Sequence, residues 1–434
     1  MRHGRDVRIH RAGPFAAFLL ATALTVLARP STAAGSAAPV DSASPQAAAP
    51  ADTSARRAGT PTDSVATRTP TDSVATRAAA AVRRPAEWDT LPGGLPEEAR
   101  FRPIVRFRYN RVDGPAPTVG AAFETARGPA PVLYASYTHA FSRERGLYEA
   151  GFSERLGDRP WFSAGASIYR RTATEDAWIV GETENTLFAL FARTDYRDYY
   201  EAAGGSGQAE WRPGSDVAIR AAVRVESETS LRTRTRVSAF GREDLFRPNP
   251  PIERGNDRGY TLTARIGPES LPTRGGTQGE VTWERSGDPL HSDFDYGRLR
   301  AVVRTRVELS PTQELRARAI GGTTRQGVLP PQRIWYLGGI GTLRGHDYKA
   351  LGGDQFLLGN AEYIRRLRKN LFGIAFLDGG AAWFGRGNLA RQTPAVDGGI
   401  GLRLGEGPVV LTLAKNLRDS GSPLHFGLRL GGSF

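Results

Sequence analysis

Short runs that alternate between apolar and polar residues fill the chain from residue 101 onward. In the first run the apolar parity holds Phe101, Val105, Phe107 and Tyr109, with arginines on the other parity. In the last run it holds Leu424, Phe426, Leu428, Leu430 and Phe434. A period of two residues is typical of strands with one apolar face. A soluble sandwich hides that face in a core, whereas a membrane barrel turns it to lipid, and periodicity alone does not separate the two.

The spacing of the turns favours the membrane alternative. About sixteen runs can be counted, each of roughly the length that a tilted membrane strand needs. Every second link is short and rich in turn residues, and several of the others are long, near 171–204, 228–258, 322–352 and 385–395. Outer-membrane barrels have short periplasmic turns and long outer loops. We therefore predict an all-β fold over residues 101–434, a transmembrane antiparallel β-barrel, with a large soluble all-β protein as the alternative.

One of the long links carries a helical pattern. Leu187, Leu190 and Phe191 are spaced as on one face of a helix within residues 185–200, and Gly204-Gly205 follow. We predict an outer-loop helix that ends before these glycines. It either covers the mouth of the barrel or packs on the rim for stability.

The first hundred residues have a different character. Residues 1–38 combine arginines, the apolar run 15–27 and small residues near Ala33, which predicts a secretory signal peptide, with an uncleaved anchor helix as the alternative. Residues 39–100 are rich in Ala, Pro and Thr and too poor in large apolar residues to form a core, so we predict a disordered linker. The sequence TPTDSVATR at 60–68 recurs at 69–77, a tandem repeat that suits a tether.

Composition narrows the class of protein further. The chain is 39% hydrophobic, but no internal stretch reaches the length of a membrane-spanning helix, so any span must be built from strands. The net charge is +13, yet the arginines alternate with apolar residues instead of forming one patch, which argues against a nucleic-acid partner and suits contact with outer-membrane lipid. The absence of cysteine excludes disulfides and cysteine-based zinc sites.

Motifs for catalysis are absent from the sequence. There is no G-x-S-x-G elbow, no H-E-x-x-H and no phosphate-binding loop. The histidines His139, His291, His346 and His425 lack the spacing of metal ligands. We predict that the protein is not an enzyme and has no cofactor and no metal. His425, on the inner parity of the last strand, leaves an outer-membrane hydrolase as the alternative.

The strongest chemical signal lies near the C-terminus, where an arginine in a glycine-rich loop precedes two strands that carry carboxylates. Arg344 stands in the run Leu343-Arg344-Gly345-His346, and Glu362 and Asp378 follow on the next two strands. A guanidinium is always charged, so a loop that folds into a barrel lumen can dock there only if carboxylates receive it. Glu362 and Asp378 are the candidates.

These segments resemble the bacterial surface antigen family, which comprises the outer-membrane assembly and two-partner-secretion barrels. The run 338–346 is similar to the family's arginine-glycine loop motif, 359–362 to its Asn-x-Glu, and 376–380 to its Phe-x-Asp-x-Gly. The resemblance implies that the sixth outer loop folds into the lumen. It places the loop motif Leu343, Arg344, Gly345 and His346 there, with Glu362, Asp378 and Gly380 as its lumen partners.

Family members usually carry POTRA domains before the barrel, small periplasmic units that capture client polypeptides. Residues 39–100 show no apolar periodicity of such a unit, so we predict a short branch without POTRA domains. Family function would lie at the lateral seam between the first and last strands, here Pro103, Val105, Phe107, Gly427, Gly431 and Gly432. Pro103 lacks a backbone donor and the two C-terminal glycines weaken the closing strand, although Pro103 can also merely start its strand.

The resemblance also implies location and activity. Phe434 resembles the terminal aromatic signal by which outer-membrane barrels are assembled, so we predict the bacterial outer membrane. The expected function is outer-membrane protein insertion or translocation, or lipid movement, through the seam. Its partners would be client outer-membrane proteins and a separate periplasmic protein. The alternative is a passive anion-preferring channel or a structural barrel.

Overall fold

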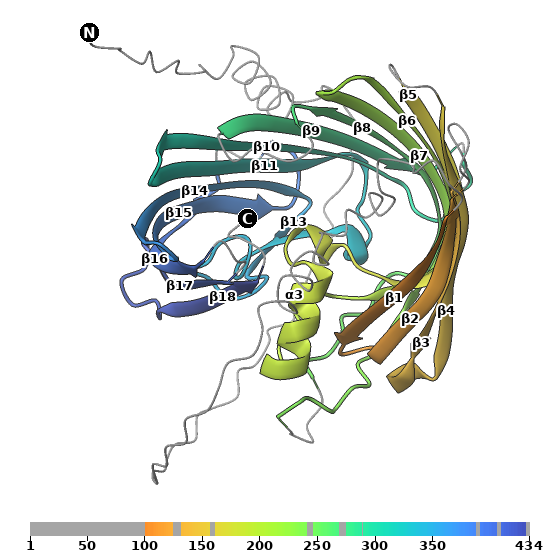
Figure 1. Ribbon diagram of the computed structural model, residues 1–434, viewed down its shortest axis with the longest axis horizontal. Helices are drawn as coiled ribbons and strands as arrows, with labels where there is room; N and C mark the ends of the chain where they lie inside the picture. Colours follow the sequence, from red (N-terminus) through yellow and green to blue (C-terminus); the bar gives the residue numbers. More distant parts are fainter. Residues whose placement is uncertain are drawn as a thin grey trace, which may run out of the picture. The chain divides into compact units, whose positions relative to one another are not determined.

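One antiparallel sheet of 16 strands follows the chain order from end to end (Figure 1). Its first eight strands are β1 (Arg100–Asn110), β2 (Gly114–Glu124), β3 (Val132–Ala140), β4 (Arg145–Leu156), β5 (Trp161–Ala173), β6 (Tyr200–Gly214), β7 (Val217–Ser230) and β8 (Gly255–Ile266). Its last eight are β9 (Gly275–Ser286), β10 (Tyr296–Ser310), β11 (Gln313–Gly327), β14 (Gln355–Arg368), β15 (Leu371–Trp383), β16 (Ala395–Leu404), β17 (Val409–Asn416) and β18 (His425–Leu430). Each alternating run of the sequence forms one strand, and the predicted all-β fold is confirmed.

The computed structural model describes residues 100–124, 132–156, 161–240, 246–268, 275–288, 290–387, 391–405 and 409–430. The predicted signal peptide of residues 1–38 and the predicted linker of residues 39–100, apart from Arg100, lie outside these residues. Gly431, Gly432 and Phe434 lie outside them as well. These assignments therefore stay predictions.

From β4 onward the links between strands alternate in length as the sequence indicates, whereas the first link on the end of the long links, between β1 and β2, covers only positions 111–113. The links after β6, β10 and β14 cover only positions 215–216, 311–312 and 369–370. Those after β5, β7 and β11 cover 174–199, 231–254 and 328–354. Because neighbouring strands are antiparallel, the short links share one end of the sheet and the long links the other.

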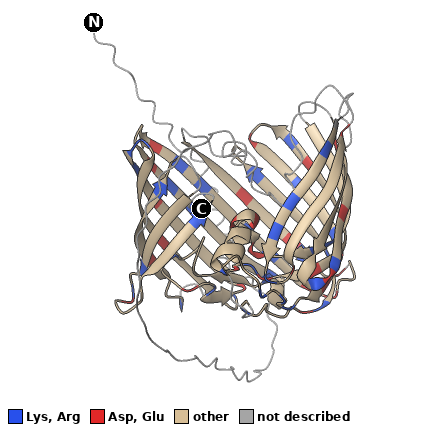
Figure 2. Ribbon diagram, turned by 60° about the horizontal axis from the view of Figure 1, so that its bottom comes forward, with Lys and Arg blue, Asp and Glu red and all other residues tan. Residues whose placement is uncertain are grey.

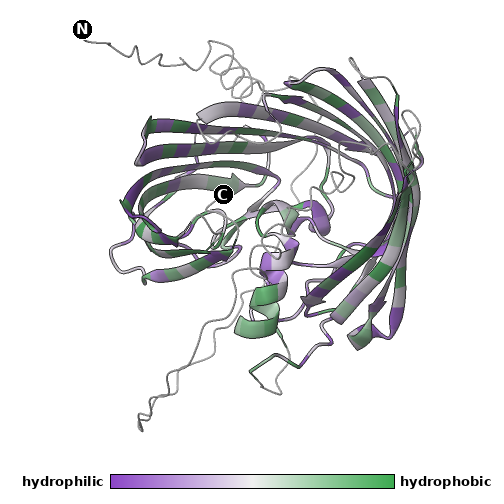
Figure 3. Ribbon diagram, viewed as in Figure 1, coloured by the Kyte–Doolittle hydropathy of each residue, from purple (hydrophilic) through white to green (hydrophobic). Residues whose placement is uncertain are grey.

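The sheet is apolar on its outer face and charged within. Val105 is 78% exposed and Ile168 62% exposed, whereas the carboxylate-bearing residues Glu228 and Asp378 are fully buried. Figure 3 shows the alternation along the strands, and Figure 2 shows basic and acidic residues interspersed along them. A soluble protein has the opposite arrangement, since charged residues are almost never fully buried unless they are paired. The outer face therefore suits lipid. No helix among the described residues is long and apolar enough to cross a membrane.

The predicted loop helix is present, but its bounds were wrong. Helix α3 covers Glu182–Leu187 and continues as the π-helix η3 over Phe188–Ala192. It ends at Arg193, whose φ of 54° is left-handed. Gly204 does not stop the helix because it lies inside β6, where a Cβ would come 2.0 Å from the carbonyl oxygen of Val225.

The long link between β11 and β14 has a structure that the sequence pattern did not indicate. Within it, β12 (Trp335–Leu337) and β13 (Leu351–Gly353) pair as a small second sheet. Leu337 and Leu343 are fully buried and pack with Phe356 of β14 in the largest apolar cluster of the described residues. We call residues 328–354 the inner loop, since it packs against the inner face of the sheet.

Candidate functional site

Arg344 anchors the inner loop to the wall. Its Nε and Nη2 donate to the two carboxylate oxygens of Asp378 at 2.7 and 2.6 Å, and its Nη1 donates to Oε1 of Glu362 at 2.5 Å. Only 8% of the Arg344 side chain is exposed, and both carboxylate side chains are fully buried. The guanidinium also lies 3.6 Å from the ring centroid of Phe376. This planar fork, shared by two carboxylates, has a geometry that lysine cannot reproduce.

Polar side chains of the wall also hold the backbone of the inner loop. Asn360 of β14 donates to the carbonyl oxygen of Thr342 at 2.8 Å and to Oδ1 of Asp378 at 2.8 Å. Arg318 of β11 donates to the carbonyl oxygen of Gly341 and to Oδ1 of Asn360, each at 2.7 Å. The loop carbonyls thus find donors, as buried backbone groups must.

The rest of the predicted loop motif contacts a third strand. The backbone N–H of Gly345 donates to Oδ2 of Asp397 on β16 at 2.7 Å, and Nδ1 of His346 lies 2.8 Å from Oδ1 of the same carboxylate. A Cβ at Gly345 would come within 2.5 Å of the backbone of Lys415, so this position requires glycine. Sequence reasoning missed Asp397, although it lies on β16, the strand that follows the Phe-x-Asp-x-Gly strand, and pairs there with Asp378.

Gly380 and Leu343 have packing roles. Leu343 is fully buried in the apolar cluster of the inner loop. At Gly380 a Cβ would come 2.8 Å from the carbonyl oxygen of Leu357 and 3.3 Å from Cδ1 of Leu337. Gly380 therefore gives the loop room beside β15, whereas Glu362 and Asp378 bind the arginine.

A second arginine of the inner loop, Arg333, anchors it to the opposite wall. It contacts the carboxylates of Glu175 and Glu228, lies 2.8 Å from Oδ2 of Asp257, and donates to the hydroxyl of Tyr200 at 2.6 Å. Its side chain is 3% exposed, and those of Glu228 and Asp257 are fully buried. The sequence offered no signal for this site, because Glu228 and Asp257 lie far from Arg333 in the chain and match no motif.

Lys349 ties the inner loop to the link between β5 and β6. Its Nζ lies 2.8 Å from Oδ2 of Asp176 and 2.6 Å from Oδ2 of Asp198. Burial acts to raise the pKa of Asp198, but Lys349 and Arg247 outweigh it and lower the pKa to about 2. Burial and the nearby Asp198 raise the pKa of Asp176 despite Lys349. Both carboxylates lie within ion-pair distance of Lys349, and the lowered pKa of Asp198 favours its charged form beside the lysine.

The seam lies between the two ends of the sheet. Within the described residues β1 pairs only with β2, and β18 only with β17. Pro103 is opposite Ala121 inside β1, which begins at Arg100, so the alternative in which Pro103 starts its strand is wrong. A residue without a backbone donor belongs on a sheet edge. Val105 and Phe107 of β1 are exposed, and Gly427 lies opposite Thr412 within β18.

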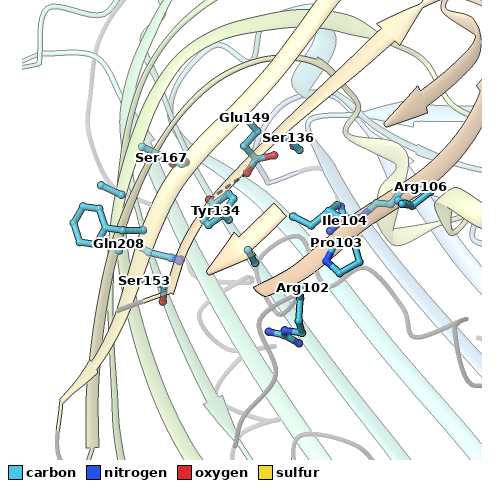
Figure 4. Close-up of a pocket in the computed structure, with 16 residues that line it drawn as sticks. Arg102, Pro103, Ile104, Arg106, Tyr134, Ser136, Glu149, Ser153, Ser167 and Gln208 are labelled. Atoms are coloured by element: carbon cyan, nitrogen blue, oxygen red, sulfur yellow. Dashed lines mark hydrogen bonds between the residues drawn. The ribbon is translucent and has the colours of Figure 1, made fainter. Parts of the chain in front are cut away.

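A polar cavity of about 300 Å³ lies beside the first strand. Figure 4 shows side chains of β1, β3, β4, β5 and β6 around it, among them Arg102, Pro103, Tyr134, Glu149 and Gln208. The cavity thus borders the edge strand β1 of the seam.

Comparison with known protein families identifies a domain in the C-terminal part of the chain. Residues 265–434 match the sequence profile described as the Omp85 superfamily domain.

Residues 265–434 form an Omp85 superfamily domain.

The Omp85 domain covers β9 to β18 and the whole inner loop with Arg344, Glu362 and Asp378. The surface-antigen resemblance is thereby confirmed, and the protein is an outer-membrane β-barrel protein. No curated protein sequence matches the chain.

Solved structures share the fold of this protein. The barrel of BamA from Haemophilus ducreyi, in a form lacking POTRA domains 1–3, superposes with a TM-score of 0.54 at 12% identity over 78% of this chain and 71% of that one. CdiB from Acinetobacter baumannii gives 0.39 at 14% identity, covering 78% of this chain and 60% of its own. CdiB from Escherichia coli gives 0.42 at 11% identity, covering 78% and 62%. At this identity the BamA match is evidence for the fold alone.

Proposed function

We propose that this outer-membrane barrel assists the insertion or translocation of other outer-membrane proteins through the seam between β1 and β18. The observation that carries the proposal is the pair of strand edges without a second strand neighbour in the described sheet, held beside an inner loop that is anchored by Arg344 and Arg333. An exposed strand edge is a template on which another chain can add a strand. A client strand could pair there without any covalent chemistry.

The rest of the structure fits this activity. The inner loop contacts two separate parts of the sheet, β7 and β15, and buried ion pairs hold it there. These contacts can maintain the curvature of the sheet although β1 and β18 are not paired with each other in the described residues. The polar cavity beside β1 offers polar side chains to a polypeptide that approaches the seam. Capture of clients in the periplasm would fall to a separate protein.

Reconstitution tests this function. We expect liposomes that contain the purified chain to accelerate the folding of a second, unrelated outer-membrane barrel at least about tenfold over empty liposomes. This corresponds to a folding barrier that is lower by about 1.4 kcal/mol. The readout is the rate at which the client becomes protected from added protease. Liposomes with an equal amount of a heat-inactivated chain are the control. No acceleration, together with anion conductance in the same vesicles, would identify a passive channel instead.

A further inference from the structure

Helix α3 lies between the two edges of the seam (Figure 1). It belongs to the link between β5 and β6, far along the chain from both edges, and none of the family motifs accounts for it. Its side chains contact β1 on one side and β18 on the other. We propose that α3 is a latch that closes the seam from inside and must release β18 before a client strand can pair there.

The contact with β18 depends on one carboxylate. Oε1 of Glu184 accepts the backbone N–H of Leu430 at 2.7 Å and lies 2.9 Å from Nε of Arg429. The side chain of Glu184 is 4% exposed. A free backbone donor on the edge strand is thereby satisfied by a side chain instead of by another strand.

The contact with β1 is made by the same turn of helix. Oγ1 of Thr186 accepts the backbone N–H of Tyr109 at 3.2 Å. Behind it, Ala189 and Leu190 pack with Tyr109 and Phe246 in a small apolar cluster. Both edge strands therefore direct a backbone donor at α3, which competes with any incoming strand for these groups.

The two contacts differ in strength. On the β1 side the link that carries α3 is held further by Arg111, whose fully buried side chain lies 2.6 Å from Asp198 and 3.4 Å from Asp195. On the β18 side, within the described residues, the hydrogen bonds and the ion pair all involve Glu184. The latch is thus held more firmly at β1, and it opens at β18.

This inference rests on the proposed function for its purpose, but its test needs no client. The chain has no cysteine, so spin labels can be placed at Phe107→Cys and Phe426→Cys, two outward-facing positions of β1 and β18. We expect Glu184→Ala to broaden the distribution of distances between these labels. We also expect it to speed amide exchange in residues 425–430 by roughly 10- to 100-fold, since a hydrogen bond to a charged group is stronger than one between neutral groups. Exchange in β10 should stay as in the parent.

Two further variants sharpen the test. Glu184→Gln keeps an oxygen that can accept the Leu430 N–H but loses the charge opposite Arg429, so its effect should be intermediate. Glu182→Ala is the matched control, because Glu182 is a half-buried glutamate on the same helix whose ion-pair contact, 3.9 Å to Arg108, is with β1 and not with β18. Equal distances and equal exchange in Glu184→Ala and Glu182→Ala would overturn the latch. A loosened seam without client folding in liposomes would instead leave the latch standing and overturn the proposed function.

Discussion

Arg344→Ala is expected to release the inner loop and to reduce the free energy of unfolding by about 3–5 kcal/mol, because it leaves two buried carboxylates, Glu362 and Asp378, without their cation. Amide exchange in residues 338–354 should rise to the rate of an exposed loop. The same variant should no longer accelerate client folding in liposomes. Arg344→Lys should be intermediate, since an ammonium is a single point charge and cannot donate to both carboxylates in the same way.

A compensating variant separates the effect of unpaired carboxylate charges on stability from the effect of Arg344 on the position of the inner loop. Arg344→Ala combined with Glu362→Gln and Asp378→Asn removes the unpaired charges, so stability should largely return while the loop stays released. Wild-type exchange rates in residues 338–354 of Arg344→Ala would contradict the anchoring role.

Arg333→Met is expected to have a comparable effect on the opposite wall. It removes the cation that lies among Glu175, Glu228 and Asp257 and keeps much of the side-chain volume. The loss in the free energy of unfolding should be about 3–5 kcal/mol, measured as a shift of the denaturant midpoint in detergent micelles. In this variant Asp257 retains an ion pair with Arg224 at 2.8 Å, so Glu228 is the carboxylate that the loss of the Arg333 charge affects most.

The matched test for Arg333 follows from that difference. Arg333→Met with Glu228→Gln should recover much of the stability, whereas Arg333→Met with Glu280→Gln, a partly exposed glutamate elsewhere on the wall, should not. Equal recovery in both double variants would show that the loss comes from packing and not from an uncompensated charge at Glu228.

The strands were predictable from the sequence because lipid outside and charges inside impose a strict period of two. The Arg344 site was predictable because its partners lie on the two strands that follow the loop, within one short stretch of chain. Arg333 was not, since its partners come from β7, β8 and the link before α3, and only the curvature of the sheet brings them together.

Helix α3 shows a further limit of the sequence pattern. The apolar spacing indicated a helix, but the contacts of Glu184 and Thr186 with the seam depend on where the link between β5 and β6 lies in three dimensions. The predicted bounds of the helix were wrong because Arg193 ends it in a left-handed conformation that no feature of the sequence indicates. Gly204 does not end the helix but allows β6 to approach β7 closely. Local pattern thus located the helix but not its role.

Locking the seam between β1 and β18 tests whether polypeptide passes through it. Cysteines at Phe107 and Phe426, which both face outward, would be joined by a short, reducible crosslinker. A control variant would be crosslinked in the same way within the sheet, at the outward-facing paired positions Val119 and Tyr137. We expect the seam crosslink to abolish the acceleration of client folding, and reduction of the crosslink to restore it. The control crosslink between β2 and β3 should have no effect. Full acceleration with the seam locked would show that polypeptide does not pass between β1 and β18.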